Sequence, residues 1–267
     1  MGGKHGIAVA GVLVLLVGSY LLFNNPAPSE TPLGGEFFIS NVTGYIAGYP
    51  NETVELHIYW IKGGDGNFSG VFMVGGLPPC VKARGIGLME LSQRGELREA
   101  LLSIILTLGK PGRCVLDGAY VELLQGNRSK RVPLGRVEFV ILKPEAERPV
   151  ITRYISGLSG SEPPRKVPFS YTLFNPLNEP VEVLNVTFNL SDFRLEGFRP
   201  VKILPNHMAN ITFTLVNTIK PGSLYVIRPI LVYRVGSETH VMPAETYYLD
   251  TIPDDETLKK MLRGEGP

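Results

Sequence analysis

Residue types that commonly do chemistry are sparse in this sequence and do not gather along it. The four histidines lie far apart, with no cysteine or carboxylate at metal-ligand spacing around them: His5, His57, His207 and His240. The segment Arg84-Gly85-Ile86-Gly87 holds only part of the glycine pattern that binds phosphate, and the GxSxG, HExxH and P-loop signatures do not occur. We therefore expect no catalytic residue, no metal site and no cofactor, in a protein that is not an enzyme.

One short segment has oxygen ligands of the kind that calcium prefers. Gly63-Gly64-Asp65-Gly66-Asn67 offers an aspartate and an asparagine within a turn, but the EF-hand pattern is absent. A plain hairpin turn explains the same residues and is the favoured interpretation.

The chemistry that the sequence does indicate is N-linked glycosylation. Seven of the 13 asparagines precede X-Ser/Thr, with X never proline. This excess predicts glycans and export from the cytoplasm. The seven are Asn41, Asn51, Asn67, Asn127, Asn185, Asn189 and Asn210.

Strand alternation and turn composition place several of these asparagines in solvent. Apolar residues alternate with polar ones from Leu184 to Leu190, which predicts that Asn185 and Asn189 point to one polar face of a strand. Asn67 and Asn127 fall in glycine-bearing loops.

The two cysteines, Cys80 and Cys114, both fall in the part of the chain expected outside the cell. Thiols in an oxidising compartment pair, so we predict a disulfide between them. Two unpaired buried thiols are the less favoured alternative.

The N-terminus predicts a membrane helix. The run Ile7 to Phe23 has 17 residues without a charge, and as a helix it would span about 25 Å. Lys4 and His5 precede it and no charge follows until Glu30, so the positive-inside rule places residues 1–6 in the cytoplasm. We expect a single-pass protein of the cell membrane with its C-terminal part extracellular.

Two alternatives stay open for the same segment. A cleaved signal peptide would use Val17 and Ser19 as the small residues before the cut. A prepilin-type leader is the other, because Lys4-His5-Gly6 before an apolar run resembles the processing site of type IV pilins. That resemblance implies a filament subunit in which residues 7–23 form the helical core.

Beyond this segment the composition indicates two β domains. Residues 24–35 have the proline and glycine content of a stalk, and Lys143 to Pro149 has the composition of a domain boundary. Alternating segments separated by turns predict one β-sandwich over 36–143, with the disulfide, and a second over 150–250. Residues 251–267 form a tail with a short helix.

One segment fits two structures. Leu97, Ala100, Leu101, Ile104, Ile105 and Leu108 recur at helical spacing. The turn Gly109-Lys110-Pro111-Gly112 that follows favours a β-hairpin for 96–108 instead.

A family resemblance supports the β assignment. The segment ALLSIILTL, followed by Asp117-Gly118-Ala119-Tyr120, resembles adjoining strands and the tyrosine corner of immunoglobulin-like domains. Cys114 lies before Tyr120, so the inter-sheet disulfide of that family is not implied. The 150–250 half resembles small immunoglobulin-like β-sandwich modules of archaeal and bacterial cell-surface proteins.

The sequence thus predicts a mainly β fold, with an N-terminal transmembrane helix followed by two tandem Ig-like β-sandwich domains. The expected function is a non-enzymatic, membrane-anchored, N-glycosylated cell-surface binding or accessory protein, such as an extracellular subunit of a membrane or envelope complex. Expected partners are the membrane through residues 7–23, other envelope or membrane-complex proteins, and N-linked glycans. A net charge of +1 gives no reason to expect nucleic acid.

Overall fold

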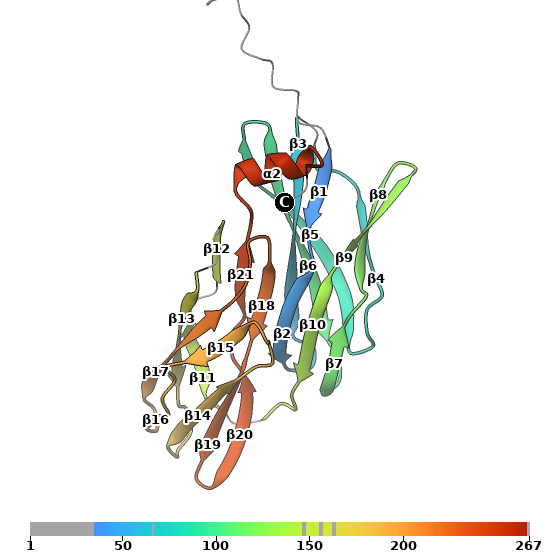
Figure 1. Ribbon diagram of the computed structural model, residues 1–267. Coiled ribbons are helices and arrows are strands. Elements are labelled where there is room, and N and C mark those ends of the chain that lie inside the picture. Colours follow the sequence, from blue (N-terminus) through green and yellow to red (C-terminus); the bar gives the residue numbers. More distant parts are fainter. Residues whose placement is uncertain (1–34, 66, 146–147, 155–156, 162–163, 266–267) are drawn as a thin grey trace, which may run out of the picture.

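The computed structural model describes residues 35–65, 67–145, 148–154, 157–161 and 164–265. Within them the chain is mainly β and forms several sheets, with a short helix near the C-terminus (Figure 1). That helix, α2 (Asp255–Leu262), begins with the Asp254 side chain accepting from the Thr257 backbone N–H at 2.8 Å, and buries Leu258. A short helix is what the tail sequence predicts.

Two sheets belong to the N-terminal half alone. The outer sheet has the order β1-β3-β6-β5 and is antiparallel throughout; its strands are β1 (Glu36–Ile39), β3 (Thr53–Gly63), β6 (Leu97–Leu108) and β5 (Val81–Arg94). The hairpin sheet has the order β4-β8-β9; its strands are β4 (Val71–Gly75), β8 (Tyr120–Gln125) and β9 (Arg128–Pro133). The apolar faces of these strands enclose one core, with Trp60 fully buried.

Two sheets belong to the C-terminal half. The β13 sheet has the order β11-β13-β17-β15, from β11 (Val150–Tyr154), β13 (Lys166–Phe174), β17 (Met208–Asn217) and β15 (Phe193–Glu196). The β14 sheet has the order β16-β14-β19-β20, from β16 (Val201–Ile203), β14 (Val181–Thr187), β19 (Ile230–Val235) and β20 (Glu238–Pro243). Their inward residues form a second core.

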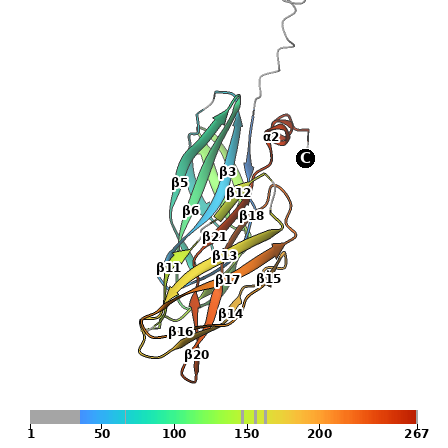
Figure 2. The same ribbon diagram turned by 90° about the vertical axis from the view of Figure 1, so that its left-hand side faces the viewer.

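The fifth sheet, the shared sheet, contains strands from both halves. Its order is β12-β21-β18-β2-β10-β7, from β12 (Gly157–Gly160), β21 (Tyr247–Thr251), β18 (Leu224–Arg228), β2 (Val42–Gly48), β10 (Gly135–Ile141) and β7 (Gly112–Leu116). β2 lies at its middle and pairs in parallel with β10 on one side and β18 on the other. Figures 1 and 2 show the two halves joined lengthwise through these strands.

β18 holds the two cores together. Leu224 and Val226 are buried in the N-terminal core, whereas Tyr225 and Ile227 are buried in the C-terminal core. Successive side chains of a strand point to opposite faces, so β18 is a wall between the cores and has no solvent face. Pro229 separates β18 from β19, which belongs to the β14 sheet.

The ambiguous segment is a strand. β6 covers Leu97–Leu108 and pairs with β3 on one side and β5 on the other. Every second residue from Leu102 to Leu108 is fully buried, which is the period of a strand. The strand interpretation of 96–108 is therefore confirmed. The hairpin expected through the turn at residues 109–112 is wrong, because β7, which follows that turn, pairs with β10 in another sheet, and β6 forms its hairpin with β5 across Gly95.

The fold class expected from the sequence is wrong, although its mainly β part is confirmed. No helix among the described residues is long and apolar enough to cross a membrane. The segment 7–23 that was expected to do so lies outside the described residues, as does most of the expected stalk. The tandem arrangement is also replaced, because the parallel β2–β18 pairing makes one sheet out of strands from both halves.

The β2–β18 pairing predicts a sensitive glycine. A Cβ added at Gly44 would come within 2.5 Å of Val226 Cγ1 and 2.9 Å of the Val226 carbonyl oxygen. We expect Gly44→Ala to lower the free energy of unfolding by about 1–3 kcal/mol through overpacking. Gly87→Ala is the matched control, because its added Cβ would meet only Ser103 atoms at 3.7 Å or more. We call the junction of the two halves along the β2–β18 pairing the seam. Denaturant midpoints that fall equally for both variants would contradict close packing at this seam.

Candidate functional site

All seven sequon asparagines are exposed in the structure. Asn41 and Asn51 stand in the turns that flank β2, and both adopt positive φ angles, 66° and 68°, which asparagine tolerates better than most residues. Asn67 lies between β3 and β4, and Asn127 lies in the β8–β9 turn. The other three belong to the C-terminal half.

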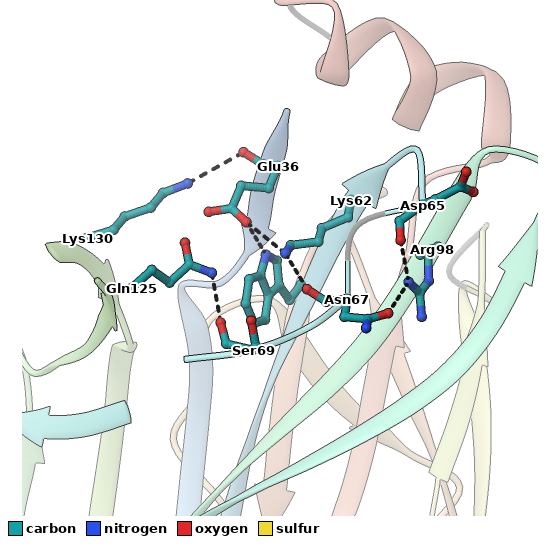
Figure 3. Close-up of polar contacts among 9 residues, drawn as sticks. Glu36, Lys62, Asp65, Asn67, Ser69, Arg98, Gln125 and Lys130 are labelled. Carbon is teal, nitrogen blue, oxygen red and sulfur yellow. Dashed lines mark hydrogen bonds and ion pairs between the residues drawn. The ribbon is translucent and has the colours of Figure 1, made fainter. Parts of the chain in front are cut away.

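The Asn67 sequon is held by contacts on each of its three residues. The side-chain oxygen Oδ1 of Asn67 accepts from the Arg98 guanidinium at 3.2 Å, and its backbone carbonyl accepts from Lys62 Nζ at 2.8 Å. The Ser69 carbonyl accepts from Gln125 Nε2 at 2.8 Å (Figure 3). These bonds fix the backbone on either side of the buried middle residue, Phe68.

Phe68, the middle residue of this sequon, is buried and packs against the N-terminal core. Its ring packs edge-on against Trp60 at 5.0 Å between centroids, and the charged groups of Lys62 and Arg98 each lie 5.5 Å from its centroid. Lys62 is also 4.5 Å from the Trp60 ring, a cation–π geometry. Glu36 completes the cluster by accepting from Trp60 Nε1 at 3.0 Å and pairing with Lys62 at 3.6 Å.

The same contacts oppose calcium at the glycine-rich turn. The carbonyl oxygen of Asp65 accepts from Arg98 at 3.3 Å, and the two described oxygens of Asn67 accept from Arg98 and Lys62. Oxygens directed at two fixed cations are poorly placed to bind a third one, since like charges at this distance repel. The hairpin-turn interpretation is also wrong, because the segment connects β3 to β4, which belong to different sheets and do not pair.

The structure brings the Asn67 and Asn127 sequons to one end of the molecule. β4 pairs with β8, and Gln125, two residues before Asn127, reaches back to Ser69 of the Asn67 sequon. Glu36 and Lys130 link β1 and β9 at the same end through the Glu36 carbonyl, at 3.5 Å (Figure 3). The sequence placed both asparagines in loops but held no signal that the loops meet.

The expected common face of Asn185 and Asn189 is not what the structure has. β14 ends at Thr187 after an irregularity between Val183 and Asn185, so the alternation does not run to Leu190. Asn189 lies beyond the strand, where its Nδ2 donates to Glu138 of β10 at 2.8 Å. Phe188 and Leu190 pack with Tyr45 and other apolar residues across the seam.

A second polar cluster lies at the junction of the halves and was missed from the sequence. Asp250, only 5% exposed, accepts from the Tyr59 hydroxyl at 2.7 Å and contacts His57 Nδ1 at 3.1 Å. The His57 ring stacks on Tyr248 at 4.1 Å between centroids. On the other side of the seam Arg228 pairs with Glu52 at 2.7 Å and donates to the Ala244 carbonyl.

These seam contacts position the halves, and the chain order explains why they escaped prediction. His57 and Asp250 are 193 residues apart, so their pairing depends entirely on the β2–β18 topology. His57 also lies 4.0 Å from Glu55, two residues before it, but its shorter contact is with the distant Asp250, for which the sequence held no signal.

The predicted disulfide is confirmed. Cys80 and Cys114 are bonded, with their Cα atoms 6.5 Å apart and a sequence separation of 34. Cys80 leads into β5 of the outer sheet, whereas Cys114 lies on β7 at the edge of the shared sheet. The bond therefore connects two sheets around the N-terminal core.

The pKa values of several buried tyrosine hydroxyls near the junction of the halves are raised. Burial, reinforced by the negative charge of Glu138, raises the pKa of Tyr45 to about 12. Burial and the nearby Glu55 and Asp250 charges also raise the pKa of Tyr248. Burial and the hydrogen bond to Glu145 raise the pKa of Tyr233 in the same direction. These groups favour the neutral form because an anion at the seam would lose its hydration.

Comparison with known proteins gives no family. No protein-family model matches the chain, and neither does any curated protein. Among solved structures, the Vibrio cholerae VesB protease is 17% identical over 37% of this chain and 31% of its own, with a TM-score of 0.28. The match thus spans less than a third of that protease.

Two further solved structures match over more of the chain. A protein of unknown function from Porphyromonas gingivalis W83 is 14% identical over 81% of this chain and 100% of its own, with a TM-score of 0.25. A structure of titin A168169 is 9% identical over 82% and 99%, with a TM-score of 0.21. Scores this low carry no argument about function, and the mainly β fold rests on the strands themselves.

Loss of the disulfide is expected to destabilise the N-terminal half. A closed loop of this size predicts a loss of roughly 3–4 kcal/mol in the free energy of unfolding for Cys80→Ala with Cys114→Ala. Guanidinium denaturation of the double variant against the oxidised wild type measures it. Reduction of the wild type should give a similar shift, and no shift in either case would contradict a stabilising role.

Alkaline pH is expected to destabilise the seam. A folded pKa of about 12 for Tyr45, against about 10 in the unfolded chain, gives a stabilisation that is complete below pH 10. It is lost as the pH rises from 10 through 12, because the unfolded state then ionises first. Denaturation at several pH values should show a shallower loss for Tyr45→Phe than for the wild type. Identical slopes would contradict the assignment.

Proposed function

We propose that this chain is an exported, N-glycosylated, non-enzymatic protein that acts as a binding or accessory component of a cell envelope or membrane complex. The observation that carries the proposal is the exposure of all seven sequon asparagines. Other asparagines give a measure of how informative this is: of the four described outside sequons, Asn175 and Asn217 are buried and Asn178 and Asn206 are exposed.

The orientation of the amides adds support. Oligosaccharide is attached at Nδ2, so a side chain that uses Oδ1 for its contacts leaves the acceptor nitrogen available. Asn67 accepts from Arg98, Asn210 accepts from Thr172 at 2.8 Å, and Asn185 accepts from the Val186 backbone N–H at 2.8 Å. The Arg98 guanidinium and the Val186 N–H can only donate, which requires the oxygen of Asn67 and of Asn185 to face them, whereas the Thr172 hydroxyl can also accept.

The disulfide fits the same compartment. Protein disulfides persist in oxidising environments outside the cytoplasm, and this one joins two sheets of the N-terminal half. The near-neutral net charge of +1 favours protein or glycan partners over nucleic acid. A kinship with archaeal or bacterial surface modules remains a sequence-based resemblance.

The proposal is tested by glycopeptide mass spectrometry of protein purified from its native source. We expect hexose-bearing modification at most of the seven asparagines and none at Asn175, Asn178, Asn206 or Asn217. All seven unmodified would refute the proposal. Protease accessibility from outside intact cells provides the second measurement, and full protection would refute export.

One sequon is expected to be modified less than the others. The Nδ2 of Asn189 donates to the Glu138 carboxylate in the folded protein, which places the acceptor nitrogen against another strand. We predict lower occupancy at Asn189 than at the neighbouring Asn185, measured on the same preparation. Glu138→Ala should raise the occupancy of Asn189 and leave Asn185 unchanged. Equal occupancy of both sites in the wild type would contradict the prediction.

A further inference from the structure

The edge strand β5 has an unpaired backbone edge and several exposed apolar side chains. It is paired with β6 along one side and forms the edge of the outer sheet along the other (Figure 2). Leu88, Met89 and Leu91 are exposed by 39%, 54% and 41% of their surface. An edge of this kind presents unpaired backbone N–H and C=O groups to any strand that approaches.

Between two irregularities β5 has a regular stretch. The register with β6 shifts between Ala83 and Gly85 and again between Glu90 and Ser92. Residues 85–90 pair one-to-one with residues 105–100 of β6. This window of six residues is long enough for a short antiparallel ladder.

Two glycines in the window are not required by the chain itself. Gly85 and Gly87 lack the positive φ that demands glycine, and a Cβ at Gly85 would meet nothing within 4 Å. At Gly87 the nearest atoms are those of Ser103, at 3.7 and 3.9 Å, which is ordinary contact. Glycine weakens a strand and marks either a bulge or a place where another backbone approaches closely. Gly85 borders the register shift after Ala83, whereas Gly87 stands in the regular stretch.

The apolar surface near β5 coincides with a stretch without sequons. No sequon occurs between Ser69 and Asn127, a region that includes β4 to β8. Six of the ten exposed large apolar side chains fall in that region: Val71, Met73, Leu88, Met89, Leu91 and Val115. In space the Asn67 sequon still lies near one end of β5, because Arg98 contacts both Asn67 and Glu90. Apolar exposure of this kind marks contact sites.

We propose that β5 pairs antiparallel with β5 of a second copy of this chain, about a two-fold axis at Gly87. In that register Met89 of one copy lies opposite Gly85 of the other, so the long side chain occupies the space that the glycine leaves. Ile86 lies opposite Leu88, and Arg84 lies opposite Glu90. The symmetry makes each of these pairs occur twice.

The faces of the strand agree with this pairing. Ile86 and Leu88 lie opposite the buried Ile104 and Leu102 of β6, which puts them on the core side of the outer sheet. Their pairing across the axis continues that apolar layer from one copy into the next. Gly85, Gly87 and Met89 lie on the opposite face with Ser103, where the methionine covers the glycine stripe.

The charges on β5 favour a second copy of this chain as its pairing partner. The basic groups Lys82 and Arg84 precede the window. The acidic Glu90, which pairs with Arg98 of its own chain at 2.8 Å and stays 55% exposed, ends it, so an antiparallel copy brings unlike charges together. Opposite charges placed across a ladder stabilise it, whereas a parallel copy would align like with like. The result is an eight-stranded sheet formed from two outer sheets.

Sedimentation velocity tests the proposal on the unglycosylated full chain in mild detergent, from nanomolar to tens of micromolar. Protein without glycans makes the result independent of the proposed function. We expect a reversible monomer–dimer equilibrium. Gly85→Val should weaken the dimer by about tenfold or more, because it fills the site of Met89, while leaving the melting temperature of the monomer unchanged or higher. Thr239→Val, on the exposed edge strand β20, is the matched control and should not change dimerisation.

Charge reversal at Arg84 gives an independent arm. Arg84→Glu should weaken the dimer because it sets two carboxylates against each other across the axis, whereas Arg84→Lys keeps the charge and should not. Glu90 is left unchanged because it pairs with Arg98 of its own chain. A monomer at every concentration would overturn the proposal. So would a dimer that Gly85→Val leaves unchanged, which would indicate association through another part of the chain. Equal dimerisation of Arg84→Glu and Arg84→Lys would also overturn it.

Discussion

The structure depends on one strand that has no solvent face. β18 pairs in parallel with β2 and antiparallel with β21, and its alternate residues complete the two cores. A shift of one residue would exchange Val226 with Ile227 between cores of different shape, and Gly44 would lose its close contact with Val226. The register is therefore specified from both sides, and the halves fold as one body around it.

Contacts away from β18 take their positions from that register. Arg228 reaches Glu52, and Asp250 meets His57 and Tyr59, because β18 and β21 are held beside the N-terminal strands. Paired and hydrogen-bonded charges of this kind add little net stability once their desolvation is counted. Their value lies in specificity, since a misplaced seam would leave Asp250 buried without a partner.

The sequence was informative wherever one strand or one turn decides the outcome. Alternation identified most strands, sequons near glycines and polar faces are exposed, and the two cysteines pair. It failed where long-range pairing decides. In β6, Ala100 is buried and the next residue, Leu101, is partly buried on the opposite face, which blurs the two-residue period. The strand assignment of this segment is decided by its pairing with β3 and β5.

The shared sheet also explains why the predicted tandem domains were plausible. Each half has a core of its own and a boundary of suitable composition near Lys143, and both features are local. The join depends on β2 and β18, whose residues pair across most of the chain length. The continuous apolar run Leu224-Tyr225-Val226-Ile227 is typical of a strand buried on both faces, which is the one local signal that this strand borders two cores.

The exposed edge of β5 is protected at its ends but not in its middle. Proteins commonly protect edge strands with charges and bulges, and β5 has both at its ends, at Lys82, Arg84, Glu90 and Arg94 and at its two register shifts. The window between them has neither, although it contains exposed apolar residues and two glycines that the fold does not need. Protection that stops short of the middle of an edge restricts pairing to partners whose charges fit its ends, and the chain itself is one such partner.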